Sequence, residues 1–179
     1  MKPVLIAGIG NIFHGDDGFG VAVARHLARS PLPAHLVRVV QVVDVGIRGL
    51  DLAYALTGGC LFAVLVDTVE RGGVPGTLYV IEPKVGGDVD GDGTISPHRV
   101  EPASVLRLAH LLGGECAKVL LVGCEPASFG EEDEGSMTLS DEVGAAVDRA
   151  ASLALSLATD WIGANESAVA DITSEERVQ

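Results

Sequence analysis

The amino-acid sequence predicts an α/β fold with a mainly parallel sheet of five strands. Apolar, often β-branched runs alternate along the chain with longer stretches that have helical apolar spacing, as in parallel strands joined by helices. Several of the runs end directly in aspartate or glycine, where α/β sheets hold ligands. A chain of 179 residues has room for one domain, because domains typically contain about 100–150 residues.

The expected strands come from the apolar runs. The first and third runs are apolar throughout, which predicts strands buried on both faces. The fourth run follows the third closely, so we expect that strand to be antiparallel to a neighbour or at an edge. The predicted strands cover residues 4–9, 36–43, 61–66, 77–81 and 119–122.

The expected helices cover residues 19–27, 50–56, 102–112 and 141–162. The segment 84–97 is rich in glycine and aspartate, which predicts a long exposed loop. We expect a single domain over residues 1–162, followed by a polar tail over residues 163–179 that is disordered.

Composition excludes several classes of protein. The net charge is −13 with 12 lysines and arginines, so nucleic acid and anionic membranes are not expected partners, because phosphate binding needs clustered cations. No apolar run approaches the roughly 18 residues of a membrane span, and the N-terminus does not resemble a signal peptide. We therefore expect a cytoplasmic protein, with a monomer as the default. Three cysteines without CxxC spacing argue against a disulfide framework and a zinc knuckle.

The glycines after the first predicted strand suggest a dinucleotide site, but the match is incomplete. The G-x-G-x-x-G fingerprint needs glycine at position 13, which is Phe13. Asp16 and Asp17 stand where a pyrophosphate would bind, and two carboxylates would repel it. Asp44, at the end of the second strand, is placed like a ribose-binding acid. A dinucleotide-binding oxidoreductase therefore stays open as an alternative.

The segment 10–20 is better interpreted as a turn that presents a carboxylate. Its glycines let the backbone bend sharply, and Asn11 can hydrogen-bond to backbone groups in the turn. An aspartate here can also simply cap the first helix. Asp16 is the better candidate for the cap, which leaves Asp17 for the functional role.

Asp67 and His98 are the other candidate site residues. Asp67 ends the buried run LFAVLVD, and a carboxylate there is costly unless it is paired, hydrogen-bonded or bound to a metal. His98 follows the predicted loop in the segment ISPH. A histidine of this kind is often an ordinary surface residue, but with two carboxylates it would complete a mixed oxygen and nitrogen set that suits zinc, nickel or manganese.

In this order, the segments GNIFHGDDGFGV, DVGIRG, LVDTV, PGTLYVIEP, ISPH and LVGCEP resemble the [NiFe]-hydrogenase maturation protease family. The resemblance runs from about residue 4 to residue 162. It implies a three-layer α/β/α sandwich around a twisted, mostly parallel sheet. It also implies an endopeptidase that removes a C-terminal extension from the hydrogenase large-subunit precursor after nickel is installed.

The resemblance makes Asp17, Asp67 and His98 the metal-binding and catalytic residues. Family members often have glutamate in place of Asp17. Many have Asp-Gly-Gly-Thr after the second strand, where this chain has Asp44-Val45-Gly46-Ile47. This chain keeps Asp44 and Gly46 of that turn, and the resemblance therefore implies that Asp44 and Gly46, with Asn11, bind the substrate. Because Ile47 lacks the hydroxyl of threonine, a side-chain contact at position 47 is in doubt.

We expect the nickel to arrive with the substrate, without any organic cofactor. The three ligands would then sense the metal in the precursor, and water would be activated by the metal or by a carboxylate base. Cys124 is better interpreted as a small buried residue than as a nucleophile. A chaperone that checks the nickel of the large subunit without cutting it is the second alternative.

Overall fold

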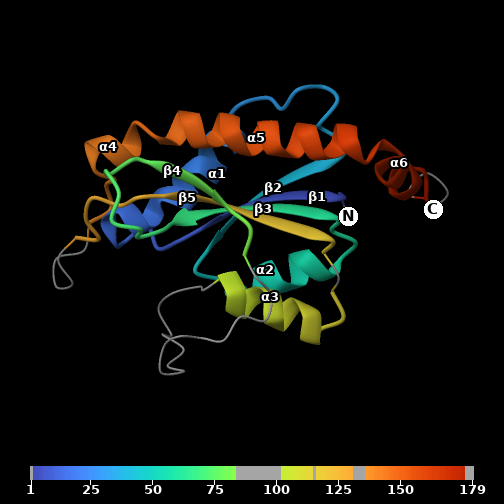
Figure 1. Ribbon diagram of the computed structural model, residues 1–179, viewed down its shortest axis with the longest axis horizontal. Helices are drawn as coiled ribbons and strands as arrows, with labels where there is room; N and C mark the ends of the chain where they lie inside the picture. The colour runs from blue at the N-terminus through green and yellow to red at the C-terminus, as the bar shows by residue number, and fades with distance from the viewer. Residues whose placement is uncertain (1, 84–101, 115, 131–135, 176–179) are drawn as a thin grey trace.

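The computed structural model of the protein describes residues 2–83, 102–114, 116–130 and 136–175 (Figure 1). Its centre is a five-stranded sheet in the order β2-β1-β3-β5-β4. Four strands run parallel, and β4 at the edge pairs antiparallel with β5. The predicted α/β class and the edge position of the fourth strand are confirmed. The strands are β1 (Val4–Ile9), β2 (Val40–Gly46), β3 (Phe62–Thr68), β4 (Leu78–Ile81) and β5 (Lys118–Cys124).

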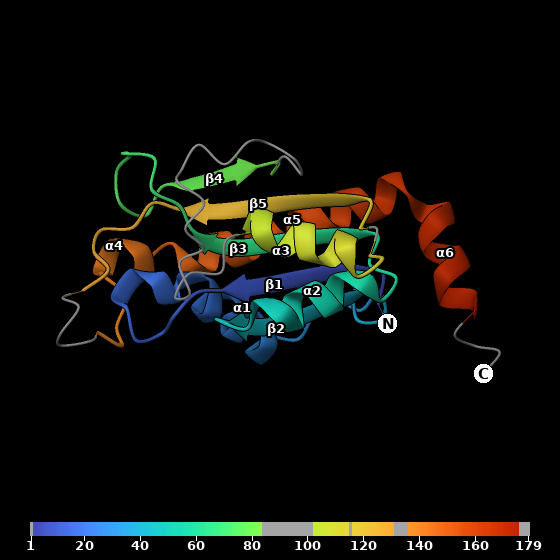
Figure 2. The ribbon, with the colours of Figure 1, turned by 90° about the horizontal axis from the view of Figure 1, so that it is seen from below.

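Helices cover both faces of the sheet, which gives the three expected layers. On one face α1 (Phe19–Arg29) and α5 (Val147–Ala164) pack over apolar side chains such as Ile6 and Val64. On the other face α2 (Gly49–Thr57) and α3 (Pro102–Leu111) lie side by side over Leu5 and Leu65. Figure 1 shows the two helix layers above and below the sheet, and Figure 2 shows α2 and α3 crossing its face.

Two predicted elements differ clearly from the structure, while the other predicted boundaries lie within two residues of the observed ones. The second strand begins at Val40, four residues later than predicted, because the segment before it forms a turn in which the backbone N–H of Val39 donates to the carbonyl of Leu36. The predicted last helix is two helices, a short α4 (Asp141–Gly144) and α5, which are separated by Ala145 and Ala146.

The prediction of a disordered tail over residues 163–179 is wrong for its first part. Residues Glu166–Glu175 form a further helix, α6. Val169 in this helix is 6% exposed and belongs to the same apolar cluster as α1 and α5. The sequence analysis does not predict this helix, because most of its residues are polar. Val169 packs the first turn of α6 against the domain.

Helix α1 lies unusually close to the sheet, and this closeness positions the loop before it. A Cβ atom on Gly20 would lie 2.1 Å from the carbonyl oxygen of Val66, and one on Gly8 would lie 2.0 Å from the carbonyl oxygen of Gly20. Both distances are shorter than atoms tolerate, so glycine is required at both positions. The start of α1 is therefore fixed over the carboxyl ends of β1 and β3.

Among the described residues, no helix is both long enough and apolar enough to cross a membrane.

Candidate functional site at the carboxyl ends of the strands

The carboxyl ends of β1, β2, β3 and β5 meet at one edge of the sheet, here called the rim. The rim comprises Gly8–Gly20, Asp44–Ile47, Asp67–Thr68 and Gly123–Pro126. Asp67 is level with Gly123 in the register of β3 and β5. The first rim segment contains the short 3-10 helix Gly15–Gly18 that leads into α1. Residues far apart in the sequence are thus brought to one place, as parallel strand order predicts.

Asp17 and Asp67 lie together at the rim, and Thr68 contacts both. The backbone N–H of Thr68 donates to Asp67 Oδ1 at 2.8 Å, and its hydroxyl lies 3.4 Å from Asp17 Oδ1. Asp17 is 8% exposed and also accepts the backbone N–H of Asn11 at 2.9 Å. The two carboxylates, here called the carboxylate pair, both contact Thr68 and make this part of the rim rich in oxygen donors, which suits a divalent cation.

Thr68 was not a candidate in the sequence analysis. It is 6% exposed and follows Asp67 in the segment LVDTV. In a buried strand its hydroxyl needs a partner, which is a signal that points to a polar neighbour but does not identify Asp17. The strand register and the close approach of α1 supply that information.

His98, the third predicted ligand, lies outside the described residues. Among the residues that the structure describes, no group of three or more histidine, cysteine or acidic side chains is placed to hold a metal ion. The described part of the candidate site therefore contains the carboxylate pair, to which a nitrogen ligand would have to be added.

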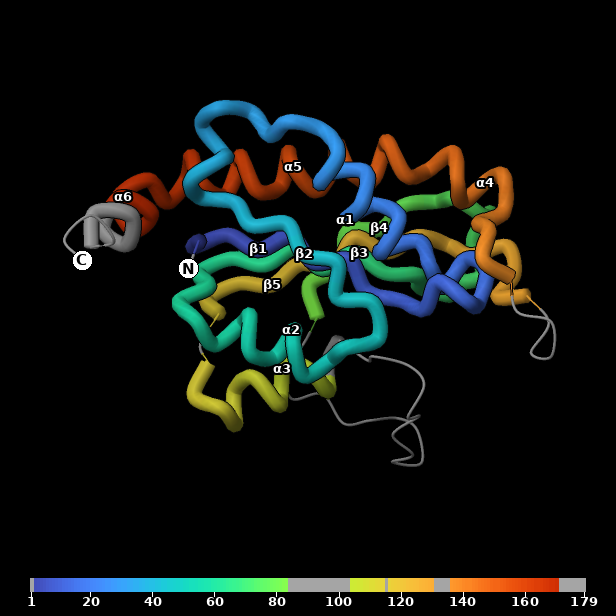
Figure 3. The backbone as a smooth tube through the Cα atoms, turned by 180° about the vertical axis from the view of Figure 1, so that it is seen from behind, coloured from blue at the N-terminus to red at the C-terminus, as the bar shows by residue number. Residues whose placement is uncertain are grey.

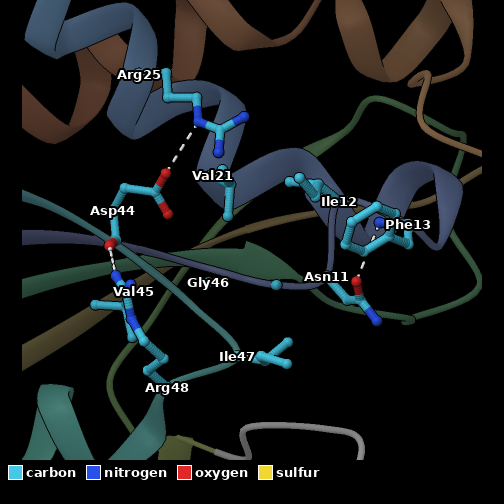
Figure 4. Close-up of a pocket in the computed structure, with 11 residues that line it drawn as sticks. Asn11, Ile12, Phe13, Val21, Arg25, Asp44, Val45, Gly46, Ile47 and Arg48 are labelled. Carbon is cyan, nitrogen blue, oxygen red and sulfur yellow. Dashed lines mark hydrogen bonds and ion pairs between the residues drawn. The ribbon is translucent and has the colours of Figure 1, made fainter.

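A pocket of about 250 Å³ opens between the glycine loop and the end of β2. Neither carboxylate of the pair lines it, but Asn11, whose backbone N–H donates to Asp17, does. Asn11, Asp44 and Gly46, the predicted substrate-binding residues, all line it (Figure 4). Gly46 has a φ of +58°, a conformation that favours glycine. It lets the chain turn sharply after β2, while its carbonyl accepts the backbone N–H of Gly10 at 3.1 Å.

Charged groups on one side of the pocket are paired with one another. Arg25 Nε donates to Asp44 Oδ2 at 2.9 Å, and Arg48 donates to the backbone carbonyl of Asp44 at 2.6 Å (Figure 4). On the other side Phe13 and Ile47 are 56% and 60% exposed. Large exposed apolar side chains beside a mainly apolar pocket are typical of a surface that binds another protein or a peptide.

The prediction that Asn11 hydrogen-bonds to a backbone group in its turn is confirmed. The side-chain oxygen of Asn11 accepts the backbone N–H of Phe13 at 3.0 Å, so the residue stabilises the turn that carries the loop. Its own backbone N–H is directed to Asp17. A carboxylate thus lies in the glycine loop where a dinucleotide would need to place its pyrophosphate, which disfavours the dinucleotide alternative.

Asp16 does not cap α1, contrary to the expectation from the sequence. Its carboxylate is fully buried and accepts the backbone N–H groups of Ala127 and Ser128 at 2.8 and 2.9 Å. It also accepts the backbone N–H and the hydroxyl of Ser140 at 2.7 and 3.0 Å. Because these donors come from the region after β5, Asp16 ties that region to the rim.

Glu125 was also not a candidate in the sequence analysis. It is a buried acid, only 5% exposed. It accepts the backbone N–H groups of Arg71 and Gly72 and the hydroxyl of Tyr79, all at about 3 Å. Burial acts to raise the pKa of Glu125, but these hydrogen bonds outweigh it and hold the pKa below its ordinary value. Glu125 therefore fixes the loop after β3 as an anion.

Cys124 is confirmed as a buried residue. It is fully buried, and burial, with the nearby charge of Asp16, raises the pKa of its thiol to about 11. A thiol with this pKa is protonated near neutral pH, which does not suit a nucleophile.

The matching family model and the similar known proteins point to one family. The family model described as hydrogenase maturation protease matches residues 21–157. The hydrogenase expression/formation protein HoxM of Cupriavidus necator is 31% identical over 175 residues, covering 98% of this chain and 83% of that protein.

Solved structures support the same relationship. The hydrogenase maturating endopeptidase HybD of E. coli superposes with a TM-score of 0.70 at 25% identity, covering 89% of this chain and 93% of that one. A hydrogenase 2 maturation peptidase from a Thaumarchaeota archaeon gives a TM-score of 0.64 at 34% identity, with 88% and 99% of the two chains covered.

Proposed function

This chain belongs to the hydrogenase maturation protease family, and we propose that it is an endopeptidase that removes the C-terminal extension of a nickel-loaded [NiFe]-hydrogenase large-subunit precursor. The observation that carries the proposal is the carboxylate pair Asp17 and Asp67, held by Thr68 at the rim. The pair lies in the part of the fold where α/β proteins bind their ligands.

Nickel enters the proposal as part of the substrate. Asp17 and Asp67 offer hard oxygen donors and His98 offers a nitrogen donor, a mixed set that suits nickel among several divalent metals. Three ligands from the protease complete the coordination of an ion that the precursor already holds. Only a loaded precursor is then held with its cleavage site in register.

The pocket at the rim suits the extended segment of the precursor. Asn11, Asp44 and Gly46 line it, while Phe13 and Ile47 offer exposed apolar surface. The net charge of −13 favours a substrate whose contacting surface is cationic or carries a metal ion. We propose that the peptide lies along this pocket and that water is activated at the Asp17–Asp67 end.

The test is a cleavage assay with purified protein and large-subunit precursor, prepared with and without nickel. We expect loss of the C-terminal peptide, measured as a mass shift, from the nickel-loaded precursor only. Asp67→Asn and His98→Ala are expected to abolish the shift. A stable complex of wild-type protein and loaded precursor without any change of mass would instead support the non-cleaving chaperone.

The nickel-free precursor separates recognition from catalysis. If it is cut at the same rate as the loaded form, the peptidase assignment holds and the nickel-sensing role is wrong. If His98→Ala cuts loaded precursor at the wild-type rate, His98 is not a ligand, and the metal site has to be sought elsewhere.

A further inference from the structure

Two of the three cysteines touch each other at the end of the sheet opposite to the rim. The Sγ atoms of Cys60 and Cys116 are 3.3 Å apart, within hydrogen-bond distance for sulfur. Both residues are free thiols. They belong to the segments that follow α2 and α3, which lie at the same end of the sheet as the N-terminus (Figures 2 and 3).

The register of β3 and β5 brings the two thiols together. Phe62 of β3 is paired with Lys118 of β5 in this parallel ladder. Cys60 lies two residues before Phe62, and Cys116 lies two residues before Lys118. Each sulfur also contacts the backbone carbonyl two residues ahead, at 3.3 Å for Cys60 and Phe62 and at 3.4 Å for Cys116 and Lys118. The two cysteines thus occupy equivalent positions just before neighbouring parallel strands, and the pairing of those strands brings them side by side.

The two thiols differ in reactivity. Their mutual hydrogen bond, with burial, raises the pKa of Cys60, which is 2% exposed. The same hydrogen bond lowers the pKa of Cys116, which is only partly buried. Since the thiolate is the attacking species in thiol chemistry, Cys116 is the more reactive and the more accessible of the two.

We propose that Cys60 and Cys116 form a reversible dithiol–disulfide site that low-molecular-weight disulfides oxidise. The sulfur atoms have to approach by little more than 1 Å, because a disulfide bond is about 2.05 Å long. In a reducing compartment such bonds are usually transient and regulatory rather than structural.

The reaction proceeds in two exchange steps. The Cys116 thiolate attacks a disulfide RSSR, which forms a mixed disulfide and releases RS⁻. Cys60 then gives up its proton and its thiolate attacks the Cys116 sulfur; the bond from that sulfur to RS breaks, the leaving RS⁻ takes up a proton, and the intramolecular bond forms. In total one RSSR is reduced to two RSH while two protein thiols are oxidised to one disulfide.

Cys124 is the matched control within the chain. It is buried like Cys60, but its sulfur contacts the backbone carbonyl of Glu125, at 3.7 Å, rather than a second thiol. Its raised pKa and its burial protect it from exchange. Oxidation should therefore modify Cys60 and Cys116 together and leave Cys124 reduced.

Peptide mapping tests the proposal on the full-length protein. The chain is equilibrated with oxidised and reduced glutathione at several ratios, its free thiols are alkylated, and it is cut with trypsin. The three cysteines fall on separate tryptic peptides, 49–71, 108–118 and 119–149. We expect a cross-linked species of the first two peptides that rises with oxidised glutathione and vanishes on reduction, while the third stays alkylated.

Two outcomes would overturn the proposal: both cysteines remaining alkylated at every ratio, or a glutathione mixed disulfide persisting on wild-type Cys116. The Cys60→Ser variant should accumulate that mixed disulfide, because it lacks the resolving thiol. The bond would close a loop from residue 60 to residue 116, so the oxidised wild type should melt higher than the reduced protein by roughly 5 °C. Neither Cys60→Ser nor Cys116→Ser should show this shift, whereas Cys124→Ser should retain it.

Discussion

Asp16 and Asp17 are neighbours in the sequence, yet they serve two different regions of the molecule. Asp16 is directed to the segments after β5, where it accepts hydrogen bonds from residues more than 100 positions away. Asp17 is directed to the sheet, where it contacts Asn11 and Thr68 beside the pocket. The short 3-10 helix that contains both turns consecutive side chains in different directions.

The difference separates a carboxylate that holds the fold from one that we propose serves the site. The partners of Asp16 are mainly backbone N–H groups, whose loss would leave buried donors without an acceptor. Asp17 lies instead beside a second carboxylate that also contacts Thr68. We therefore expect isosteric changes at the two positions to affect stability and activity in opposite proportions.

Asp17→Asn should have the largest effect, on activity. Removing one negative charge from the proposed metal-sensing pair should lower cleavage of loaded precursor by about 10²–10⁴-fold. The free energy of unfolding, measured in urea, should fall by only about 1 kcal/mol, because an amide can still accept one hydrogen bond. Cleavage at the wild-type rate would remove Asp17 from the site.

Asp16→Asn is the matched change in the other region. The amide nitrogen that replaces one carboxylate oxygen cannot accept an N–H, so at least one buried backbone donor, that of Ser140 if the amide oxygen still accepts from Ala127 and Ser128, loses its acceptor, and the unfolding free energy should fall by about 2–4 kcal/mol. The variant that does fold should retain most of its cleavage activity at low temperature. A stability equal to that of Asp17→Asn would break the distinction between the two carboxylates.

Thr68→Val sharpens the comparison on the site side. Thr68 acts as a positioning residue, because its hydroxyl contacts Asp17 while its backbone holds Asp67. Valine has the same shape without the hydroxyl, so cleavage should fall roughly 10-fold. Thr68→Ser keeps the hydroxyl and should restore most of the rate; failure of serine to do so would show that packing, not the hydrogen bond, explains the loss.

Glu125→Gln should have the smallest effect, visible in acid. The pKa of Glu125 lies below its ordinary value of about 4.5, so the folded state favours the ionised form. Its stabilising contribution is therefore full above that value and is lost as pH falls through the lowered pKa. Wild-type stability should decrease between about pH 5 and pH 3 more steeply than that of Glu125→Gln, as followed by urea unfolding. Parallel pH curves would contradict this role.

The sequence predicts the sheet well because its strands are long apolar runs. The first strand is predicted with its observed limits, residues 4–9, and the third is off by one or two residues at each end. The start of the second strand fails because the residues before it are equally apolar but form a turn. The sequence does not predict helix α6, because the position of this helix depends on the tertiary contact that Val169 makes with the core.

The candidate site is predictable in part for the same reason. Asp17, Asp44 and Asp67 stand at strand ends or in the loop after a strand, so topology alone brings them to the rim. The distinct roles of Asp16, Thr68 and Glu125 depend on contacts between segments 50 to 120 positions apart. No local pattern in the sequence specifies such partners.

The stack of Trp161 on Phe62 has a practical consequence for spectroscopy. The ring centroids are 5.2 Å apart and the planes differ by 8°. Trp161 is the single tryptophan of the chain, and Phe62 begins β3 at the end of the sheet far from the rim. The fluorescence emission of Trp161 should therefore change when the interface between α5 and the sheet unfolds and change little when a substrate binds. It is thus a suitable signal for measuring the thermal unfolding of the variants above.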